Sequence, residues 1–351
     1  MTRSTIGFRF RFEAQDAMLF VRPAVIADLD ALMELAILSG RGFTSLPEDE
    51  ATLLARLTLS EQSFAGTVPT REAWYTLMLE DSETGRVEGL CGVRAGVGVG
   101  RPHFSFRVMT LAQFSSAIAT RFDHQALVLV NECAGWTEVG SLYLRPERRS
   151  GGAGSLLARS RYMLIGAEKS RFAETVMAEL RGYFAPDGTC PFWEGVASKF
   201  FRLPFDQADH MVMSTDGQFI LDLAPRHPIY VELIDEAARD AIGKVHVEGQ
   251  AARAMLEQEG FRGSGLIDIF DGGPTYSAPR DSITTIERTR RCTVAIGDPG
   301  EAEEAIASTD SATGFRAARV AVAVDGERAL IRASDADLLG LKAGDVMRVR
   351  L

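Results

Sequence analysis

The chain has 351 residues, a net charge of −10, 46% hydrophobic residues and 25% charged residues. This composition is ordinary for a globular protein of about two domains, and it argues against nonspecific nucleic-acid binding, which needs a basic surface. No apolar run reaches the roughly 18 residues of a membrane-spanning helix, and the 4 cysteines form no CxxC pair, so we expect a reduced cytoplasmic protein without a metal site.

The N-terminal part of the chain predicts a strand and two helices before a series of strands. Residues 1–17 include an alternation of phenylalanine and arginine from Phe8 to Phe12, and they lack the apolar segment of a signal peptide. We expect either an extension from an upstream start codon or an extra edge strand. A strand is predicted at 18–22 and a helix at 27–38, and a second helix begins near Glu48. Further strands are predicted at 74–79, 87–95, 104–108, 126–131 and 140–144.

The remaining chain is predicted to contain both helices and strands, and its amino-acid composition changes near residue 285. The predicted elements are helices at 155–168, 193–201, 231–242 and 249–259, strands at 174–180 and 265–270, and short β-type runs at 319–324, 329–333 and 346–351. We therefore divide the chain into a first unit at 18–205, a second α/β unit at 206–290 and a small β-rich module at 291–351.

A glycine-rich turn between a strand and a helix carries the clearest chemical signal. Residues 149–154 read Arg-Ser-Gly-Gly-Ala-Gly, which fits the pattern R-x-x-G-x-G. Glycines at Gly152 and Gly154 allow close approach of the backbone to an anion. The N–H groups and dipole of the following helix favour negative charge. Arg145, Arg148 and Arg149 add positive charge, so the pattern indicates a pyrophosphate site, with a tight structural turn as the alternative.

Other phosphate-binding motifs fit this stretch less well. A Walker A loop requires Gly-Lys-Ser/Thr, which is absent at 149–154. A Rossmann glycine motif would follow the first strand of its unit, whereas this turn follows several strands with hairpin-like connections. The context resembles the GNAT acyltransferase superfamily, in which such a turn cradles the pyrophosphate of coenzyme A.

Six short stretches, in this order along the chain, resemble the arginine N-succinyltransferase family. They are 42–47 (GFTSLP), 79–85 (LEDSETG), 191–193 (PFW), 227–230 (HPIY), 243–246 (GKVH) and 267–274 (IDIFDGGP). The resemblance covers about 18–290 and is more specific than the glycine turn. It implies a GNAT-type mixed, mainly antiparallel sheet flanked by helices, and transfer of succinyl from succinyl-CoA to the α-amine of L-arginine in arginine catabolism.

The resemblance also implies roles for individual residues. It places the proton-donor histidine of the family at His246 and a succinyl-CoA contact at Leu142. Val247 departs from the family, which usually has proline there. Some relatives form oligomers of two similar subunits, so the implied partners are the two substrates and a homo- or hetero-oligomer. Ornithine as acceptor, or a non-catalytic subunit, remain alternatives.

Direct transfer from the thioester needs an oxyanion site, a proton donor and charge recognition of both substrates. We expect backbone N–H groups near Ser141–Leu144 to serve the oxyanion. The coenzyme A contacts expected here are Leu142, Tyr143, Leu144, Arg149, Gly152 and Gly154. The expected acceptor contacts are Thr44, Ser45 and Asp268, with Asp271, Glu132 and Glu138 as other carboxylates. Arg22, Arg41 and Arg181 are candidates for the succinyl carboxylate. Solvated surface charge is the alternative for each charged residue.

Overall fold

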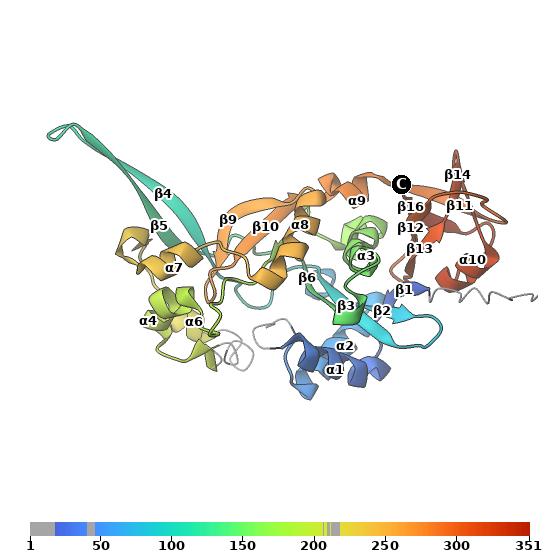
Figure 1. The fold of residues 1–351 in the computed structure, drawn as a ribbon, viewed down its shortest axis with the longest axis horizontal. Helices are drawn as coiled ribbons and strands as arrows, with labels where there is room; N and C mark the ends of the chain where they lie inside the picture. The colour runs from blue at the N-terminus through green and yellow to red at the C-terminus, as the bar shows by residue number, and fades with distance from the viewer. Residues whose placement is uncertain (1–17, 41–45, 206, 209–210, 212–217) are drawn as a thin grey trace, which may run out of the picture.

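A computed structural model describes residues 18–40, 46–205, 207–208, 211 and 218–351, and their ribbon is shown in Figure 1. The described strands form one 16-stranded sheet in the order β14-β15-β11-β16-β12-β13-β1-β2-β3-β6-β7-β10-β9-β4-β5-β8. Its pairs are antiparallel except β6 with β7 and β11 with β15. The predicted α/β class, with a mainly antiparallel sheet flanked by helices, is confirmed. No helix in the described ranges is long and apolar enough to cross a membrane.

The bounds of the elements follow most of the predicted ones within a few residues. The strands are β1 (Leu19–Pro23), β2 (Trp74–Asp81), β3 (Val87–Arg94), β4 (Ser105–Ser115), β5 (Thr120–Val130), β6 (Thr137–Leu144), β7 (Thr175–Glu179), β8 (Ile229–Tyr230), β9 (Arg262–Asp268), β10 (Pro274–Pro279), β11 (Thr289–Ile296), β12 (Glu304–Thr309), β13 (Ala317–Ala321), β14 (Ala323–Asp325), β15 (Arg328–Ile331) and β16 (Val346–Arg350). The α-helices are α1 (Leu29–Ser39), α2 (Glu50–Ala65), α3 (Ala153–Ala167), α4 (Ser198–Phe201), α6 (Gln218–Leu223), α7 (Glu236–Ala241), α8 (Gln250–Gln258), α9 (Thr284–Glu287) and α10 (Ala333–Leu339).

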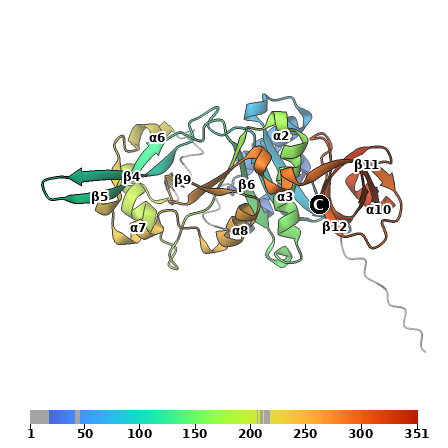
Figure 2. The same cartoon turned by 90° about the horizontal axis from the view of Figure 1, so that it is seen from above.

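Helices cover both faces of the sheet near its centre (Figures 1 and 2). Helix α2 begins where the Asp49 side chain accepts a hydrogen bond from Thr52 N at 2.8 Å, and it ends at Gly66 in the left-handed region. Together α1 and α2 pack on one face of the sheet, where Leu53 and Met78 share a buried cluster. Helix α3 packs on the other face, where the larger core cluster lies.

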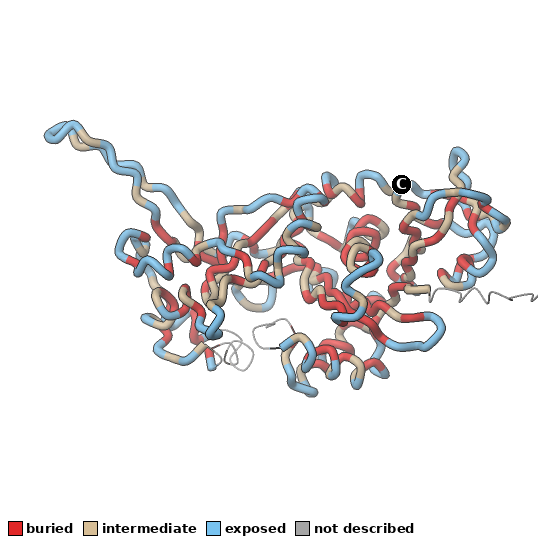
Figure 3. Tube along the Cα trace, in the orientation of Figure 1, coloured by how far each residue is buried: buried red, intermediate tan, exposed pale blue. Residues whose placement is uncertain are grey.

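The hairpin of β4 and β5 extends far beyond the two short strands that the sequence predicted at 104–108 and 126–131. It projects from the body as a two-stranded ribbon in Figures 1 and 2, and its outer part is exposed in Figure 3. Phe114, Ile118 and Phe122 are exposed there. The sequence prediction was too short because the outer strands lack the buried face that makes a strand recognisable by pattern.

The C-terminal strands join the main sheet edge to edge. Strand β13 pairs antiparallel with β1, with Phe20 opposite Ala318. The C-terminal strands have their own core, to which Val320, Leu339 and Met347 contribute. The division at residues 290 and 291 stays a prediction, since a separate core and a continuous sheet are both present.

Candidate active site

The two central strands β6 and β7 separate from each other toward their C-terminal ends. They pair in parallel only at Thr137 with Val176 and Glu138 with Met177. Beyond this point β6 stays bound to β3, and β7 stays bound to β10. Because parallel strands end at the same edge of the sheet, whatever follows β6 and whatever follows β7 flank the mouth of one opening.

A β-bulge lies in β6 along this opening. Leu90 pairs with Tyr143 and Gly92 pairs with Gly140, so Ser141 and Leu142 stand opposite the single residue Cys91. Ser141 has a φ of 48°, in the left-handed region. A bulge breaks the hydrogen-bond ladder and re-aims the neighbouring groups. The strand expected to supply oxyanion donors is therefore irregular at the positions where those donors are needed.

The other predicted coenzyme A contacts on β6 divide between the two faces of the sheet. Tyr143 packs in the cluster under α1 and α2, whereas Leu144 packs in the cluster under α3. Leu142 is partly buried against the α3 side. The described geometry thus puts Leu142 and Leu144 on one side of the strand and the Tyr143 ring on the other.

The glycine turn connects the end of β6 to the N-terminus of α3. Gly151 and Gly152 have φ values of 71° and 86°, which explains why glycines occupy these positions. Gly152 caps α3 without a side-chain hydrogen bond, and no acidic residue lies in the first helical turn. The N–H groups that open α3 are therefore available to an anion.

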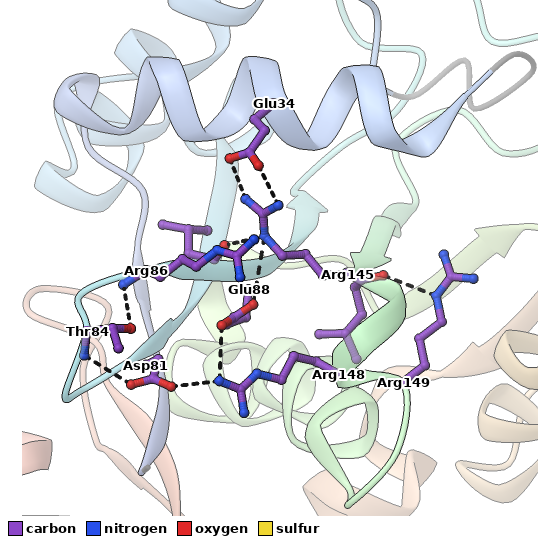
Figure 4. A network of polar contacts seen from close by, with 10 residues as sticks. Glu34, Asp81, Thr84, Arg86, Glu88, Arg145, Arg148 and Arg149 are labelled. Atoms are coloured by element: carbon purple, nitrogen blue, oxygen red, sulfur yellow. Dashed lines mark hydrogen bonds and ion pairs between the residues drawn. The ribbon is translucent and has the colours of Figure 1, made fainter.

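The three arginines near this turn have different roles (Figure 4). Arg145 is buried and forms a two-pronged ion pair with Glu34, with distances of 2.7 and 2.6 Å. Arg148 contacts Asp81 at 2.8 Å and Glu88 at 3.1 Å. Both guanidinium groups are thus committed to carboxylates of neighbouring strands and helices. Arg149 is exposed, and its Nε donates to the carbonyl of Leu144 at 3.2 Å.

A backbone hydrogen bond holds His246 beside the segment that follows β7. Its N–H donates to the carbonyl of Arg181 at 2.9 Å, next to a bridge between Gly182 and Val245. Its Nδ1 accepts a hydrogen bond from Glu248 N at 3.2 Å. An acceptor Nδ1 carries no proton, so the proton of the neutral ring is on Nε2. Burial, and then the nearby Arg181 guanidinium, lower the pKa of His246.

Arg181 is the cation nearest to His246 in this arrangement. Its guanidinium carbon lies 4.6 Å from the centre of the Phe184 ring, and the His246 ring contacts the same phenylalanine edge-on. Nε of Arg181 is buried and has no hydrogen-bond partner among the described groups. Its contact with Glu248 is long, at 3.8 Å, and Glu248 is well exposed. Burial lowers the pKa of Arg181 by more than Glu248 and Asp271 raise it, so these carboxylates compensate its charge only in part.

Asp268 and Asp271 shape the turn that supports His246. Oδ1 of Asp268 accepts from Phe270 N and Asp271 N at 2.7 and 2.9 Å. Asp271 accepts from Gly182 N at 2.7 Å, and Gly243 N donates to the carbonyl of Gly272 at 2.9 Å. These bonds connect the turn after β9 to Gly182 and to Gly243, on the two segments that the bridge beside His246 joins. Asp268 has a structural role, and its substrate role stays a prediction.

Four carboxylates interact electrostatically near the base of the opening. Burial, and then Asp271 and Glu179, raise the pKa of Asp268 well above its ordinary value. Burial and Glu179 likewise raise the pKa of Glu138. His103 contacts Glu179 at 3.0 Å, and although burial alone would lower the pKa of His103, this carboxylate raises it to about 9. The nearby Arg94 and Arg56 guanidinium groups oppose the upward shift of the Glu138 pKa, so the crowded carboxylates have cations beside them.

The structure brings some of the predicted residues together and leaves others apart. Leu142 and Leu144 lie on β6 and the glycine turn follows it, whereas His246 is bonded to Arg181 just after β7, on the other side of the opening. Thr44, Ser45 and Arg41 lie outside the described residues. Of the other charged candidates, Arg22 is held by Asp28 and Glu80, and Glu132 is held by Arg107.

Neither His103 nor Glu179 is recognisable from the sequence as a member of this acidic group. His103 lies in a loop and Glu179 ends a strand, and neither has a local motif. Only the pairing of β7 with β10 and of β9 with β4 brings them beside Asp268. The available sequence signal was Glu179 itself, a single acidic residue at the end of a buried strand.

Family models match almost the whole chain. The model described as arginine N-succinyltransferase beta subunit matches residues 19–285, and the model of its C-terminal domain matches residues 290–349. The curated arginine N-succinyltransferase of Enterobacter sp. (strain 638) is 39% identical over 334 residues, covering 95% of this chain and 97% of that protein. The protein of that name from Citrobacter koseri is also 39% identical, with the same coverage.

A solved structure shows the same fold. The arginine/ornithine succinyltransferase subunit AI from Pseudomonas aeruginosa superposes with a TM-score of 0.86 and 31% sequence identity. The match covers 95% of this chain and 98% of that one. The similarity therefore includes both the strands around the opening and the C-terminal strands.

Proposed function

The chain belongs to the arginine N-succinyltransferase beta subunit family, and on this premise we propose that it transfers succinyl from succinyl-CoA to the α-amine of L-arginine. The observation that carries the proposal is the family match along nearly the whole chain, and the matched range 19–285 includes both the glycine turn and His246. The opening between β6 and β7 supports it, since an extended acyl chain can lie along unpaired strand edges.

We propose direct attack of the amine on the thioester. Backbone N–H groups around the bulge at Ser141 stabilise the oxyanion of the tetrahedral intermediate. As this intermediate collapses, the C–S bond breaks and the Nε2–H group of neutral His246 donates a hydrogen bond to the departing thiolate. The thiolate takes the proton that the attacking nitrogen releases as it becomes an amide. One proton thus passes from nitrogen to sulfur, and the imidazole stays neutral.

The succinyl-CoA end of the site is proposed to involve the glycine turn. Gly152, Gly154 and the N-terminus of α3 hold the pyrophosphate, with Arg149 beside them. Leu142, Tyr143 and Leu144 belong to the strand that the pantetheine arm follows. The expected cytoplasmic location and the expected oligomer remain proposals, and the exposed apolar side chains of the β4–β5 hairpin support the second.

The acceptor end is proposed to use the acidic group at the base of the opening. L-Arginine carries a guanidinium and an α-ammonium, and burial together with neighbouring carboxylates raises the pKa values of Glu138 and Asp268. A bound cation lowers this repulsion. Asp268 therefore stays a candidate for acceptor binding, and Thr44 and Ser45 are retained as proposed contacts.

We expect Arg181 to select succinyl over acetyl donors. Replacing Arg181 by glutamine should raise KM for succinyl-CoA about 10- to 100-fold, because a charge-assisted contact to the succinyl carboxylate is lost. KM for acetyl-CoA should not change, since acetyl lacks that carboxylate. The measurement is initial-rate kinetics with both donors. The exposed Arg239 on α7 provides the matched control, because Arg239→Gln removes the same charge elsewhere. Equal effects of Arg181→Gln on both donors would refute this role.

The proposed function is tested by thiol release from succinyl-CoA with L-arginine, L-ornithine or buffer. We expect release that depends on arginine, at a rate proportional to enzyme concentration. Release with ornithine alone would move the acceptor assignment to that amino acid, which the name of the Pseudomonas aeruginosa relative makes a second candidate. Binding of succinyl-CoA without release would contradict catalysis by this chain alone and favour a subunit that needs a partner.

A further inference from the structure

One guanidinium group from the C-terminal strands lies directly over the glycine turn. An ideal β-carbon placed on Gly152 would be 3.1 Å from Nη2 of Arg319, and only 3.6 Å from the guanidinium carbon. Arg319 belongs to β13, about 165 residues after the turn in sequence. The pairing of β13 with β1 brings it there.

The alternation of β13 explains the direction of this side chain. Ala318 and Val320 pack in the core of the C-terminal strands. Ala317, on the opposite face, packs in the core that contains Leu156 and Leu157 of α3. Because side chains alternate along a strand, Arg319 shares the face of Ala317 and points toward α3. Its place over Gly152 is thus fixed by the register with β1.

Arg319 has no compensating charge in the described part of the chain. It forms no ion pair with a described carboxylate, and its guanidinium donates no hydrogen bond to a described group. Arg145 and Arg148 are neutralised by Glu34, Asp81 and Glu88, but no such partner is provided here. The positive charge of Arg319 also lowers, after burial and other charges, the pKa of Arg350.

This positive charge stands at an end of a helix that is itself positive. The opening N–H groups of α3 and its dipole repel a cation. The first turn of α3 has no acidic residue that would offset this repulsion. Arg149, whose guanidinium carbon lies 5.7 Å from the centre of the Tyr143 ring, adds a further exposed positive charge next to the turn. An anion at Gly152 would satisfy the opening N–H groups of α3 and the Arg319 guanidinium at once.

We propose that Arg319, from the C-terminal strands, binds the pyrophosphate of coenzyme A together with the glycine turn at Gly152. The proposal rests on the proposed acyl-CoA-dependent function and deepens it. It gives the C-terminal strands a direct part in substrate binding, since the turn supplies backbone donors and β13 supplies the charge. The adenosine 3′-phosphate is a second phosphate source on the same ligand, and the experiment separates the two.

The test compares the wild-type chain with Arg319→Gln by calorimetric titration of coenzyme A, of 3′-dephospho-coenzyme A and of pantetheine. We expect Arg319→Gln to weaken coenzyme A and 3′-dephospho-coenzyme A equally, by about 10- to 100-fold, as the loss of a charge-assisted contact predicts. Binding of pantetheine, which has no phosphate, should be unchanged. Arg319→Lys should recover part of the affinity, because lysine keeps the positive charge but lacks the planar guanidinium that donates paired hydrogen bonds to a phosphate.

Arg328→Gln is the matched control, because Arg328 is an exposed arginine on β15, four strands from β13 in the same sheet. It should leave all affinities unchanged. Unchanged coenzyme A affinity in Arg319→Gln, with an unchanged thermal unfolding midpoint, would overturn the proposal. A loss seen with coenzyme A but not with 3′-dephospho-coenzyme A would also overturn it, by assigning Arg319 to the 3′-phosphate. Failure of the wild type to bind coenzyme A would instead refute the proposed function.

Discussion

Replacing His246 by alanine is expected to lower kcat by about 10²- to 10³-fold, which is the usual loss when one hydrogen-bond donor to a developing negative charge is removed. The affinity for succinyl-CoA should change little, because the proposed pyrophosphate contacts lie at the other side of the opening. Steady-state kinetics and calorimetric titration measure the two quantities. Since burial and then Arg181 lower the pKa of His246, the acid limb of wild-type kcat is expected below the ordinary histidine value of about 6.5.

A second variant separates chemistry from structure at this position. Nδ1 of His246 accepts from Glu248 N, so alanine also removes a cap from the turn 247–249. His246→Asn keeps an acceptor near the position of Nδ1, and asparagine is a favoured cap, but it has no donor in place of Nε2. We expect His246→Asn to retain the unfolding midpoint and still lose turnover. Full turnover in His246→Asn would show that His246 is only a capping residue.

Replacing Gly152 by valine is expected to weaken coenzyme A binding by about 100-fold. A β-branched residue at a φ of 86° is strained, at a cost of about 1–3 kcal/mol. Its β-carbon would also be 3.1 Å from Nη2 of Arg319, so the guanidinium has to move. The side chain would then occupy the space through which the pyrophosphate reaches the N–H groups of α3. Calorimetric titration of coenzyme A measures the loss.

The adjacent glycine provides a matched control. Gly151 has a similar φ of 71°, but a β-carbon there would have no heavy atom within 4 Å. Gly151→Val therefore introduces the same kind of backbone strain without the collision. We expect both variants to lower the unfolding midpoint and only Gly152→Val to show the large loss of coenzyme A affinity. Equal affinities in the two variants would contradict the steric argument.

The sequence predicted the elements that have a buried face and strong boundaries. The helix expected at 155–168 is α3, and its start is marked by glycines that the backbone needs at positive φ. The strand at 140–144 was found because it precedes that turn. By contrast, the predicted helix at 231–242 is a 3₁₀ turn followed by α7, because Asp235 starts a new helix at Glu236.

Several strands were missed because tertiary pairing, rather than pattern, defines them. Strand β10 begins and ends with proline, and β12 lies in a stretch rich in small and polar residues. Both are held by neighbours on each side. The residues of the candidate site likewise divide into those with a local sequence pattern and those that depend on tertiary pairing. The glycine turn has a local pattern and His246 belongs to a family stretch, whereas Arg319 has neither and depends on the register of β13 with β1.

The pairing of β13 with β1 also has a consequence for synthesis of the chain on the ribosome. Strand β1 is among the first elements to emerge, but one of its edges is covered only when Ala317–Ala321 has been made. At about 5–20 residues per second, the nascent chain exposes this unpaired edge for tens of seconds. An exposed edge can recruit another strand. Chaperone dependence of this protein should therefore fall when β13 is supplied early, as in a circular permutant that begins with the C-terminal strands.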